Sequence, residues 1–229
     1  MVRGIQDEKI TRAAGALKIM PVLSVNPATC RPEILEPAVD WLRAGGVVAM
    51  PTDTFYGLAV DPTSATAVRA VFGLKGRSRG AALPLVAGSF DQVLRAFGDL
   101  QILSRRLATE FWPGPLSLVV DAPASLDAAV HGGRRTVAVR VPDHRVTRTL
   151  ALAWGAPLTA TSANRSGAPP ARSVDDLSAL SAGDGLFVID GGVTAGGAAS
   201  TIVDARQTPV TLVREGAVSW NRVLESLRG

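Results

Sequence analysis

Short polar segments that could bind a charged ligand recur along the sequence, each after an apolar stretch. They are Pro51-Thr52-Asp53-Thr54-Phe55-Tyr56-Gly57-Leu58, Lys75-Gly76-Arg77, Thr136–Arg140 and Thr161-Ser162-Ala163-Asn164. Their hydroxyl, amide and cationic side chains are the groups that proteins use to bind and position phosphates. Taken singly, the segments are also ordinary turns, a solvated basic loop and an edge strand. Because together they hold no nucleophile next to a base, they favour binding and positioning over covalent catalysis.

Lys75 differs from the other basic residues of the chain. The sequence contains 21 Arg and three Lys, and after Lys18 every basic residue is arginine except Lys75. An arginine-rich genome explains the excess but not this exception. Because a compact ammonium group suits a phosphate oxygen in a tight pocket, Lys75 is a candidate phosphate contact.

The signatures of several common enzyme classes are missing from the sequence. It has no Walker A loop, no G-x-G-x-x-G, H-E-x-x-H or G-x-S-x-G pattern, and no paired C-x-x-C. Two histidines and one cysteine do not favour a protein-held zinc site. We expect Cys30 to be a small buried hydrophobic residue, and His131 and His144 to have structural or solvent-facing roles.

Length and composition predict one large folded domain. The 229 residues are 47% hydrophobic and 19% charged, and the single cysteine excludes a disulfide scaffold. The net charge of +4 permits an anionic ligand or RNA, whereas 5% aromatic residues argue against a base-stacking surface. No run is apolar enough to cross a bilayer, and the N-terminus does not resemble a signal peptide. We therefore expect a cytoplasmic protein with its main domain over residues 20–229 and a flexible extension over residues 1–19.

Hydrophobic periodicity predicts helices and strands in uneven alternation. Expected helices cover residues 32–44, 62–73, 91–97, 100–111, 144–154 and 174–182, with a last one after Ser219. Expected strands cover residues 47–50, 83–86, 116–120, 136–141, 158–160, 186–189, 201–203 and 210–213. Irregular connections are expected over residues 121–135 and 161–172. Two helices in succession and three strands near the C-terminus predict a layered α/β domain with a mixed sheet.

Taken in order, these segments resemble the Sua5/YrdC/YwlC family of L-threonylcarbamoyladenylate synthases, in its short, single-domain form. The resemblance covers about residues 30–228 and rests on seven motifs. The motifs are Pro51–Leu58, Lys75-x-Arg77, Trp112-Pro113-Gly114-Pro115-Leu116, Thr136–Pro142, Ser162-Ala163-Asn164 with Ser166-Gly167, Ser200-Thr201-Ile202 and Arg214-Glu215-Gly216-Ala217. No single motif is diagnostic, whereas seven in family order are.

The resemblance implies a three-layer α/β (α+β) fold of the YrdC/RibB-like type, with a twisted mixed β-sheet flanked by helices and a large basic cleft. It implies an enzyme that joins L-threonine, bicarbonate and ATP into threonylcarbamoyl-AMP and diphosphate. The product would pass to a tRNA threonylcarbamoyl-transferase complex that modifies adenosine 37 of tRNAs reading ANN codons. Mg²⁺ is expected with ATP, held mostly by the phosphates. Whether tRNA itself binds stays open.

The same resemblance assigns roles to single residues. Thr52, Arg140 and Ser200 would bind L-threonine, with the planar guanidinium of Arg140 pairing its carboxylate. Lys75 and Arg77 would be catalytic, since they would neutralise the triphosphate and the departing diphosphate. The expected ATP contacts are Lys75, Arg77, Thr136, Ser162, Asn164 and Arg214. No metal-binding residue is implied.

Two stretches depart from the family pattern. Residues 78–85 lack the family's Asn and contain two extra positions, and a histidine that touches threonine in some members would fall near Gly88. Pro170 replaces a usual serine, and Ala199 replaces an acid that is common before Ser-Thr-Ile. These changes put amino-acid specificity and turnover in question more than nucleotide binding.

Three other functions stay open on the sequence. They are an RNA-binding protein without catalysis, a domain that handles carbamoyl-adenylate as in carbamoyltransferases, and an inactive paralogue. RNA affinity that falls steeply with salt, without ATP turnover, would indicate the first. The second usually belongs to longer multidomain chains, so 229 residues argue against it.

Overall fold

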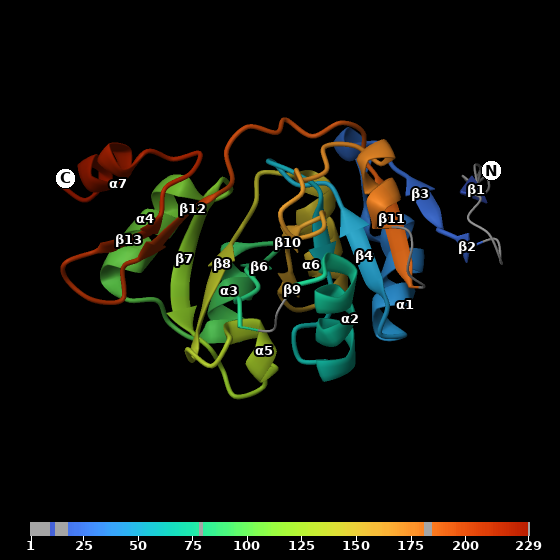
Figure 1. Ribbon diagram of the computed structural model, residues 1–229. Helices are drawn as coiled ribbons and strands as arrows, with labels where there is room; N and C mark the ends of the chain where they lie inside the picture. Colours follow the sequence, from blue (N-terminus) through green and yellow to red (C-terminus); the bar gives the residue numbers. More distant parts are fainter. Residues whose placement is uncertain (1–9, 12–17, 78–79, 181–184, 229) are drawn as a thin grey trace.

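The computed structural model of the chain describes residues 10–11, 18–77, 80–180 and 185–228. Two mixed β-sheets stand side by side with helices around them (Figure 1). One sheet has five strands, in the order β10 (Thr161–Ser162), β5 (Gly57–Ala59), β4 (Val47–Met50), β11 (Leu186–Asp190) and β3 (Val22–Ser24). The other has six, in the order β13 (Thr211–Arg214), β12 (Thr201–Asp204), β7 (Leu116–Asp121), β8 (Thr136–Arg140), β6 (Leu85–Val86) and β9 (Leu158–Thr159).

Seven α-helices surround the sheets in the described part of the chain, and the longest has 11 residues. They are α1 (Glu36–Arg43), α2 (Ala65–Lys75), α3 (Phe90–Phe97), α4 (Ile102–Phe111), α5 (Ala128–His131), α6 (Arg145–Trp154) and α7 (Trp220–Ser226). Three short 3₁₀ turns complete them: η1 (Pro27–Thr29), η2 (Pro32–Leu35) and η3 (Asp175–Ala179). Among the described residues, no helix has the length and apolar character that crossing a membrane requires.

The expected fold class, a layered α/β domain with mixed pairing, is confirmed, but the strands from β3 onward form two sheets where one was expected. The chain changes sheets within a few residues, because β9 belongs to the six-stranded sheet and β10 to the five-stranded one. Between them, the amide of Ala160 donates to the carbonyl of Pro84 at 2.8 Å. The sheets are thus joined where β9 leads into β10.

Several local expectations need correction. Helix α2 was expected to end at Gly73 but continues to Lys75, because Gly76 adopts the left-handed conformation (φ +58°) that ends a helix. The connection over residues 121–135 contains the short helix α5, and strand β5 was not expected. The helix expected over residues 174–182 is a 3₁₀ turn, and its end falls outside the described residues.

The N-terminal extension is described only in part. Residues 1–9 and 12–17 lie outside the described residues, whereas Ile10–Thr11 and Lys18–Ile19 pair antiparallel as strands β1 and β2. The boundary at residue 20 therefore stays a prediction.

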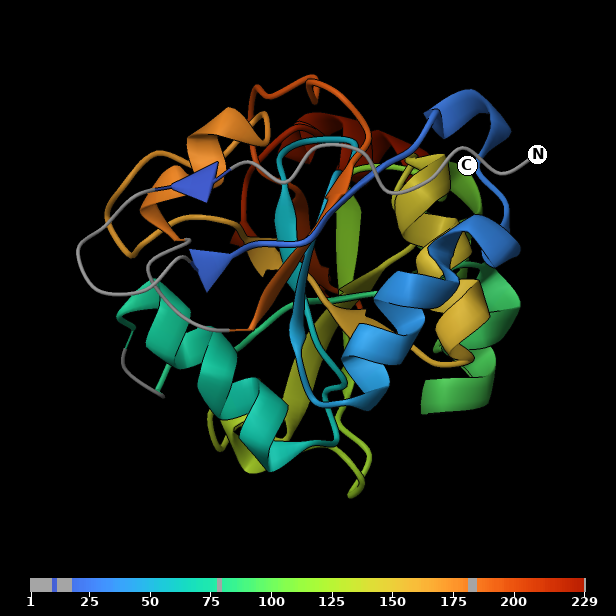
Figure 2. The same cartoon turned by 90° about the vertical axis from the view of Figure 1, so that its right-hand side faces the viewer.

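The five-stranded sheet is covered on both sides. In β4, Val47 and Ala49 belong to one buried cluster, whereas Val48 and Met50 belong to another, as the period of two in a strand requires. Helices α1 and α6 lie against one side and α2 against the other (Figure 2). Because both sides are buried, β4 is a continuous apolar run.

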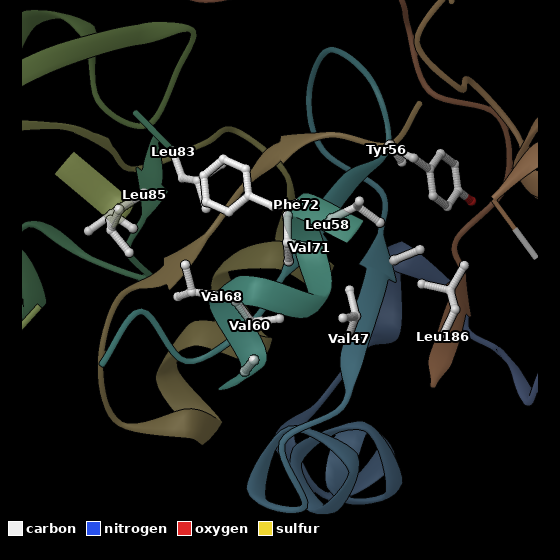
Figure 3. Close-up of a cluster of buried hydrophobic side chains, with 14 of the residues drawn as sticks. Val47, Tyr56, Leu58, Val60, Val68, Val71, Phe72, Leu83, Leu85 and Leu186 are labelled. Atoms are coloured by element: carbon white, nitrogen blue, oxygen red, sulfur yellow. The ribbon is translucent and has the colours of Figure 1, made fainter. Parts of the chain in front are cut away.

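One buried cluster connects both sheets across helix α2. Val68, Val71 and Phe72 of α2 lie between Leu85 of the six-stranded sheet and Val47 of the five-stranded sheet (Figure 3). This shared core fixes the two sheets relative to each other. Any site between them therefore has rigid walls.

The six-stranded sheet is covered by helices mainly on one side. Leu116 and Leu118 of β7 and Val203 of β12 pack with Leu107 of α4 and Val223 of α7 in a separate buried cluster. The alternate residues of the same strands point to the opposite side, where no helix of this cluster lies. That side carries the candidate site.

Candidate functional site

A cavity of about 650 Å³ lies between the two sheets. This volume is within the range of roughly 300–1,000 Å³ that is usual for small-molecule sites. Thr52 and the residues 54–57, in and just after the loop that follows β4, line one wall together with Thr161–Ser162 of β10. The opposite wall is the uncovered side of the six-stranded sheet.

Strand alternation brings the expected β8 residues into the cavity. Thr136, Ala138 and Arg140 line it, and the intervening Val137 and Val139 belong to the buried core, although Val137 also borders the cavity. This is the period-two pattern of a strand with one side packed and one side open. Thr136 and Arg140 therefore lie on the same side of β8, as their expected roles require.

The same alternation continues in β12. Ser200, just before the strand, Ile202 and Asp204 line the cavity, and Thr201 and Val203 are fully buried behind them. Ile202 pairs in register with Arg214 of β13, which also lines the cavity. The sheet wall thus has apolar residues in the middle and polar or charged residues around them.

The described cavity wall carries an excess of positive charge. Arg77, Arg134, Arg140 and Arg214 line it, against the single carboxylate of Asp204. Burial lowers the pKa of Arg214 from its ordinary value, and the charge of Arg140 lowers it further. Two guanidinium groups close enough to affect each other favour an anionic ligand between them.

Arg140 sits in a buried corner with the Pro51–Leu58 motif. It is 7% exposed, and its Nη1 donates to Oδ1 of Asp53 in an ion pair. Its Nη2 donates to the hydroxyl of Thr52 at 3.5 Å. The Thr52 hydroxyl in turn donates to the carbonyl of Phe55 at 2.7 Å and accepts from the amide of Thr54 at 3.2 Å. Thr52 thus shapes the turn and lies beside Arg140.

Ser200 and Arg214 form a second polar cluster on the sheet wall. Arg214 Nη2 donates to the carbonyl of Ser200 at 2.6 Å, and the hydroxyls of Ser200 and Ser117 lie 3.0 Å apart. A Cβ at Gly216 would lie 2.0 Å from the carbonyl oxygen of Ala199, so glycine is required for this close approach. The Arg214–Ala217 motif therefore serves to hold Arg214 against Ser200.

Lys75 lies behind the cavity wall and not in it. Its side chain is 3% exposed, and the ammonium donates to three protein oxygens: the carbonyls of Ser162 and Asn164 and, at 2.9 Å, Oδ1 of Asn164. Ser162 also donates its hydroxyl to Oδ1 of Asn164 at 2.7 Å. Burial, and secondarily Arg77, lowers the pKa of Lys75 to about 8.

Most of the predicted site residues meet in this one cavity. Those that line it are Thr52, Arg77, Thr136, Arg140, Ser162, Ser200 and Arg214. Lys75 and Asn164 do not line it, and they contact it through Ser162. Direct phosphate contact by Lys75 and Asn164, as the resemblance implied, is therefore not what this geometry shows.

One of the seven motifs lies outside the cavity. The indole of Trp112 donates to the carbonyl of Leu116 at 2.6 Å, and the amide of Gly114 donates to the carbonyl of Val141. None of the residues Trp112–Leu116 lines the cavity. The motif joins the end of α4 to the sheet.

A loop between β11 and β12 passes from one sheet to the other over the top of the molecule (Figure 1). Tyr56 donates its hydroxyl to the carbonyl of Gly192 at 2.8 Å, and the amide of Gly196 donates to the carbonyl of Thr54 at 2.7 Å. Burial raises the pKa of Tyr56 to about 12, so the hydroxyl keeps its proton. Tyr56 of the Pro51–Leu58 motif thus anchors the loop between β11 and β12 to the cavity wall.

The positions that depart from the family pattern have different surroundings. A Cβ at Gly88 would lie 2.4 Å from Leu152 and 2.6 Å from the carbonyl oxygen of Arg148, so this position packs against α6 and does not line the cavity. Ala199 does line the cavity, and Pro170 does not. Residues 78–79 of the altered stretch lie outside the described residues, and Ala81 and Ala82 line the cavity.

The remaining sulfur and imidazole groups are away from the cavity. Cys30 is 1% exposed in a hydrophobic cluster, as expected. His131 and His144 do not line the cavity. In the part of the chain that the structure describes, no three His, Cys, Asp or Glu residues are grouped to hold a metal ion.

Three site residues were not predicted. Arg134 and Asp204 line the cavity, and Asp53 pairs with Arg140. Every second residue of a strand faces the same side, so counting from Ser200 through Ile202 would have indicated Asp204. Asp53 lies in a recognised motif, but no sequence pattern reveals its partner 87 positions away.

Comparisons with known proteins show which family the chain resembles. The Sua5/YciO/YrdC family model, described as telomere recombination, matches residues 40–216. A Thiobacillus denitrificans protein named threonylcarbamoyl-AMP synthase is 38% identical over 164 residues, 72% of this chain and 87% of the relative. The crystal structure of Pyrococcus abyssi Sua5 complexed with L-threonine has a TM-score of 0.83 and 32% identity, over 90% of this chain and 60% of that one. Escherichia coli YciO, at 21% identity and a TM-score of 0.78 over 89% of this chain and 99% of that one, shares the fold.

Proposed function

This chain belongs to the Sua5/YciO/YrdC family, and we propose that it is a threonylcarbamoyl-AMP synthase, a nucleotidyltransferase that acts on L-threonine and ATP. The observation that carries the proposal is the single cavity in which Arg140 and Thr52, at the threonine-binding motif, meet Arg77, Arg134 and Arg214. Relatives named for this activity, and a structural neighbour complexed with L-threonine, support it.

We propose that bicarbonate is the third substrate. The amine of threonine condenses with bicarbonate to a carbamate, with loss of water. A carbamate oxygen then attacks the α-phosphorus of ATP, the bond from that phosphorus to the bridging oxygen breaks, and diphosphate leaves. The cavity needs no nucleophile of its own for this route, since charge and position are what phosphoryl-group chemistry requires of the protein.

The cavity residues divide between the two substrates. Arg140, beside Thr52, pairs with the carboxylate of threonine, and Ser200 lies within reach of Arg214 on the neighbouring strand. Arg77 and Arg134 supply charge for the triphosphate and the departing diphosphate. The apolar part of the wall, formed by Val119, Ala138, Ile202 and Val213, suits the flat base of the nucleotide.

We propose that Mg²⁺ arrives bound to ATP. Asp204, the one carboxylate among the described lining residues, already accepts from Arg206 through both of its oxygens. The residues present therefore do not fit a dedicated protein-held site, and the phosphates would supply most of the ligands. When bound, the ion would neutralise charge on the triphosphate.

The wider context is also a proposal. The product would be passed to a tRNA threonylcarbamoyl-transferase complex for modification of adenosine 37 in tRNAs that read ANN codons, which places the protein in the cytoplasm. We also propose direct contact with tRNA through the arginines that line the cavity, which would show as salt-dependent RNA affinity.

Diphosphate release tests the function directly. The protein is incubated with ATP, bicarbonate and one amino acid at a time, and the product is identified by mass spectrometry. We expect release that requires both threonine and bicarbonate, and its loss in Ala138→Phe, which fills the cavity, but not in Ala44→Phe, at an exposed position after α1.

Other outcomes would contradict the proposal and identify a rival. RNA affinity that falls steeply with salt, without any ATP turnover, would indicate an RNA-binding protein. Turnover that needs carbamoyl phosphate in place of threonine would indicate a carbamoyl-adenylate enzyme. Nucleotide binding without turnover of any amino acid would indicate an inactive paralogue.

A further inference from the structure

We propose that Asp53 is a positioning residue for L-threonine binding, and that it acts through Arg140 without touching the substrate. This inference rests on the proposed function, because it concerns the side chain that would receive the threonine carboxylate. The observations behind it are the burial of the Asp53–Arg140 pair, the way the carboxylate is held, and its place outside the cavity.

The pair is buried and asymmetric. The side chains of Arg140 and Asp53 are 8% and 10% exposed. Arg140 lines the cavity, whereas Asp53 does not, although its neighbours Thr52 and Thr54 do. Asp53 therefore contacts the guanidinium without being part of the cavity wall.

Both oxygens of the Asp53 carboxylate are in use. Oδ1 accepts from Nη1 of Arg140, and Oδ2 accepts from the backbone amide of Asp143 at 3.3 Å. Arg140 ends β8 and Asp143 precedes α6, so one carboxylate joins the loop after β4 to the connection between β8 and α6. It thereby ties a loop of the five-stranded sheet to a strand of the six-stranded sheet.

The backbone that carries Asp53 is itself fixed. The hydroxyl of Thr147 in α6 donates to the carbonyl of Pro51. On the other side, Thr52 closes the turn by donating to the carbonyl of Phe55. With its backbone held on both sides, Asp53 has little freedom to follow Arg140, so the carboxylate sets the position of the guanidinium.

This arrangement has an electrostatic consequence for the cavity. Arg140 and Arg214 carry like charges on the same cavity wall, and the pKa of Arg214 is lowered first by burial and further by the charge of Arg140. Without Asp53, the buried guanidinium of Arg140 would lose its counter-ion and turn toward solvent or another acceptor. A guanidinium has five N–H donors, so binding Asp53 at one nitrogen leaves others for a substrate carboxylate.

A double-mutant cycle tests the proposal. Threonine affinity is measured by calorimetry for the wild type, Asp53→Asn, Arg140→Met and the double variant, and ATP affinity is measured beside it. We expect Asp53→Asn to weaken threonine binding about 10- to 100-fold, the range for hydrogen bonds to charged groups, with ATP affinity unchanged within twofold. The double variant should bind threonine no more weakly than Arg140→Met alone, because both changes disable the same group.

Asp143→Asn is the matched control. Asp143 lies near the same pair, but its carboxylate is exposed and contacts Arg148 at 3.4 Å. It should leave threonine affinity within twofold of the wild type. If Asp53→Asn fails to fold, the double variant, in which both members of the buried pair are neutral, still provides the comparison with Arg140→Met.

The proposal is overturned by either of two results. Threonine affinity within twofold of the wild type in Asp53→Asn would show that the carboxylate does not set the site. If the double variant lost threonine affinity by the sum of the two single losses in binding free energy, Asp53 would contact the substrate itself. If the wild type binds no threonine, the proposed function fails, and the coupling of the two variants in the free energy of unfolding still tests whether Asp53 holds Arg140.

Discussion

Two cations, Lys75 and Arg140, are both buried in the structure, but their surroundings differ. The sequence predicts that both contact a substrate. Lys75 is 3% exposed and gives its three N–H bonds to Ser162 and Asn164. Arg140 is 7% exposed, pairs with Asp53 and still lines the cavity. The ammonium of Lys75 therefore holds the loop of Ser162 and Asn164, whereas the charge of Arg140 borders the cavity. The position of a cation in a motif thus predicts where a site lies, but it does not predict whether that cation contacts the substrate directly.

Replacing Lys75 with Met is expected to have the largest effect of the changes that test this comparison. Ser162, which lines the cavity, loses the hydrogen bond to its carbonyl and the support of Asn164. It would then no longer be a preorganised donor, so adenylate formation should fall by at least ~10²-fold. The loop should also lose amide protection in hydrogen exchange over residues 161–168 in the nucleotide-free protein, which is the measurement that separates support from direct contact.

Arg69→Met, on the exposed side of the same helix, is the control for Lys75. It should change neither diphosphate release nor exchange of the loop. Unchanged exchange in Lys75→Met together with lost activity would mean that Lys75 binds phosphate directly, and the distinction between the two cations would be wrong.

Replacing Arg140 with Ala should have a smaller and more selective effect. We expect the KM for L-threonine to rise about 10- to 100-fold, because a charged hydrogen-bond donor to its carboxylate is lost, while the KM for ATP changes little. Steady-state kinetics with each substrate varied in turn measure the two KM values separately. The control is Arg105→Ala in α4, whose side chain pairs with exposed Asp99 on the helix-covered side of the six-stranded sheet. An unchanged threonine titration in Arg140→Ala would remove the assignment.

The sequence predicts the framework well where the local pattern is decisive. Val47–Met50 is a strand because four apolar residues lie between glycines and Pro51, and burial on both sides leaves no other arrangement. The alternation in Thr136–Arg140 places Thr136 and Arg140 on one side of β8. In these elements the residues that decide the structure are neighbours in the chain.

Other features depend on partners that are distant in sequence. Two glycines, Gly73 and Gly76, were each able to end α2, and the left-handed conformation of Gly76 decides between them. Strand β5 is three residues long inside a polar motif, and pairing with β4 and β10 makes it a strand. Residue type and the resemblance both predict a phosphate contact for Lys75, and neither reveals its three acceptors, which lie nearly 90 positions further along the chain.

A final and smaller effect concerns the pH dependence of stability. Burial lowers the pKa of Lys75 in the folded protein from its ordinary value of 10.5 to about 8. Between these values the unfolded chain binds the proton and the folded protein releases it, so the contribution of Lys75 to the free energy of unfolding rises with pH from about 8 to about 10.5.

Chemical denaturation of the wild type and Lys75→Met at pH 7, 8, 9 and 10 measures the contribution of Lys75 to the free energy of unfolding. The free energy of unfolding of the wild type, taken relative to Lys75→Met, should be flat below pH 8 and rise above it. A difference that stays constant to pH 10 would mean that the ammonium is not desolvated in the folded state, and therefore that Lys75 faces water or an open cavity as Arg140 does. The comparison between the two cations would then lose its physical basis, because their difference rests on Lys75 being enclosed by protein oxygens.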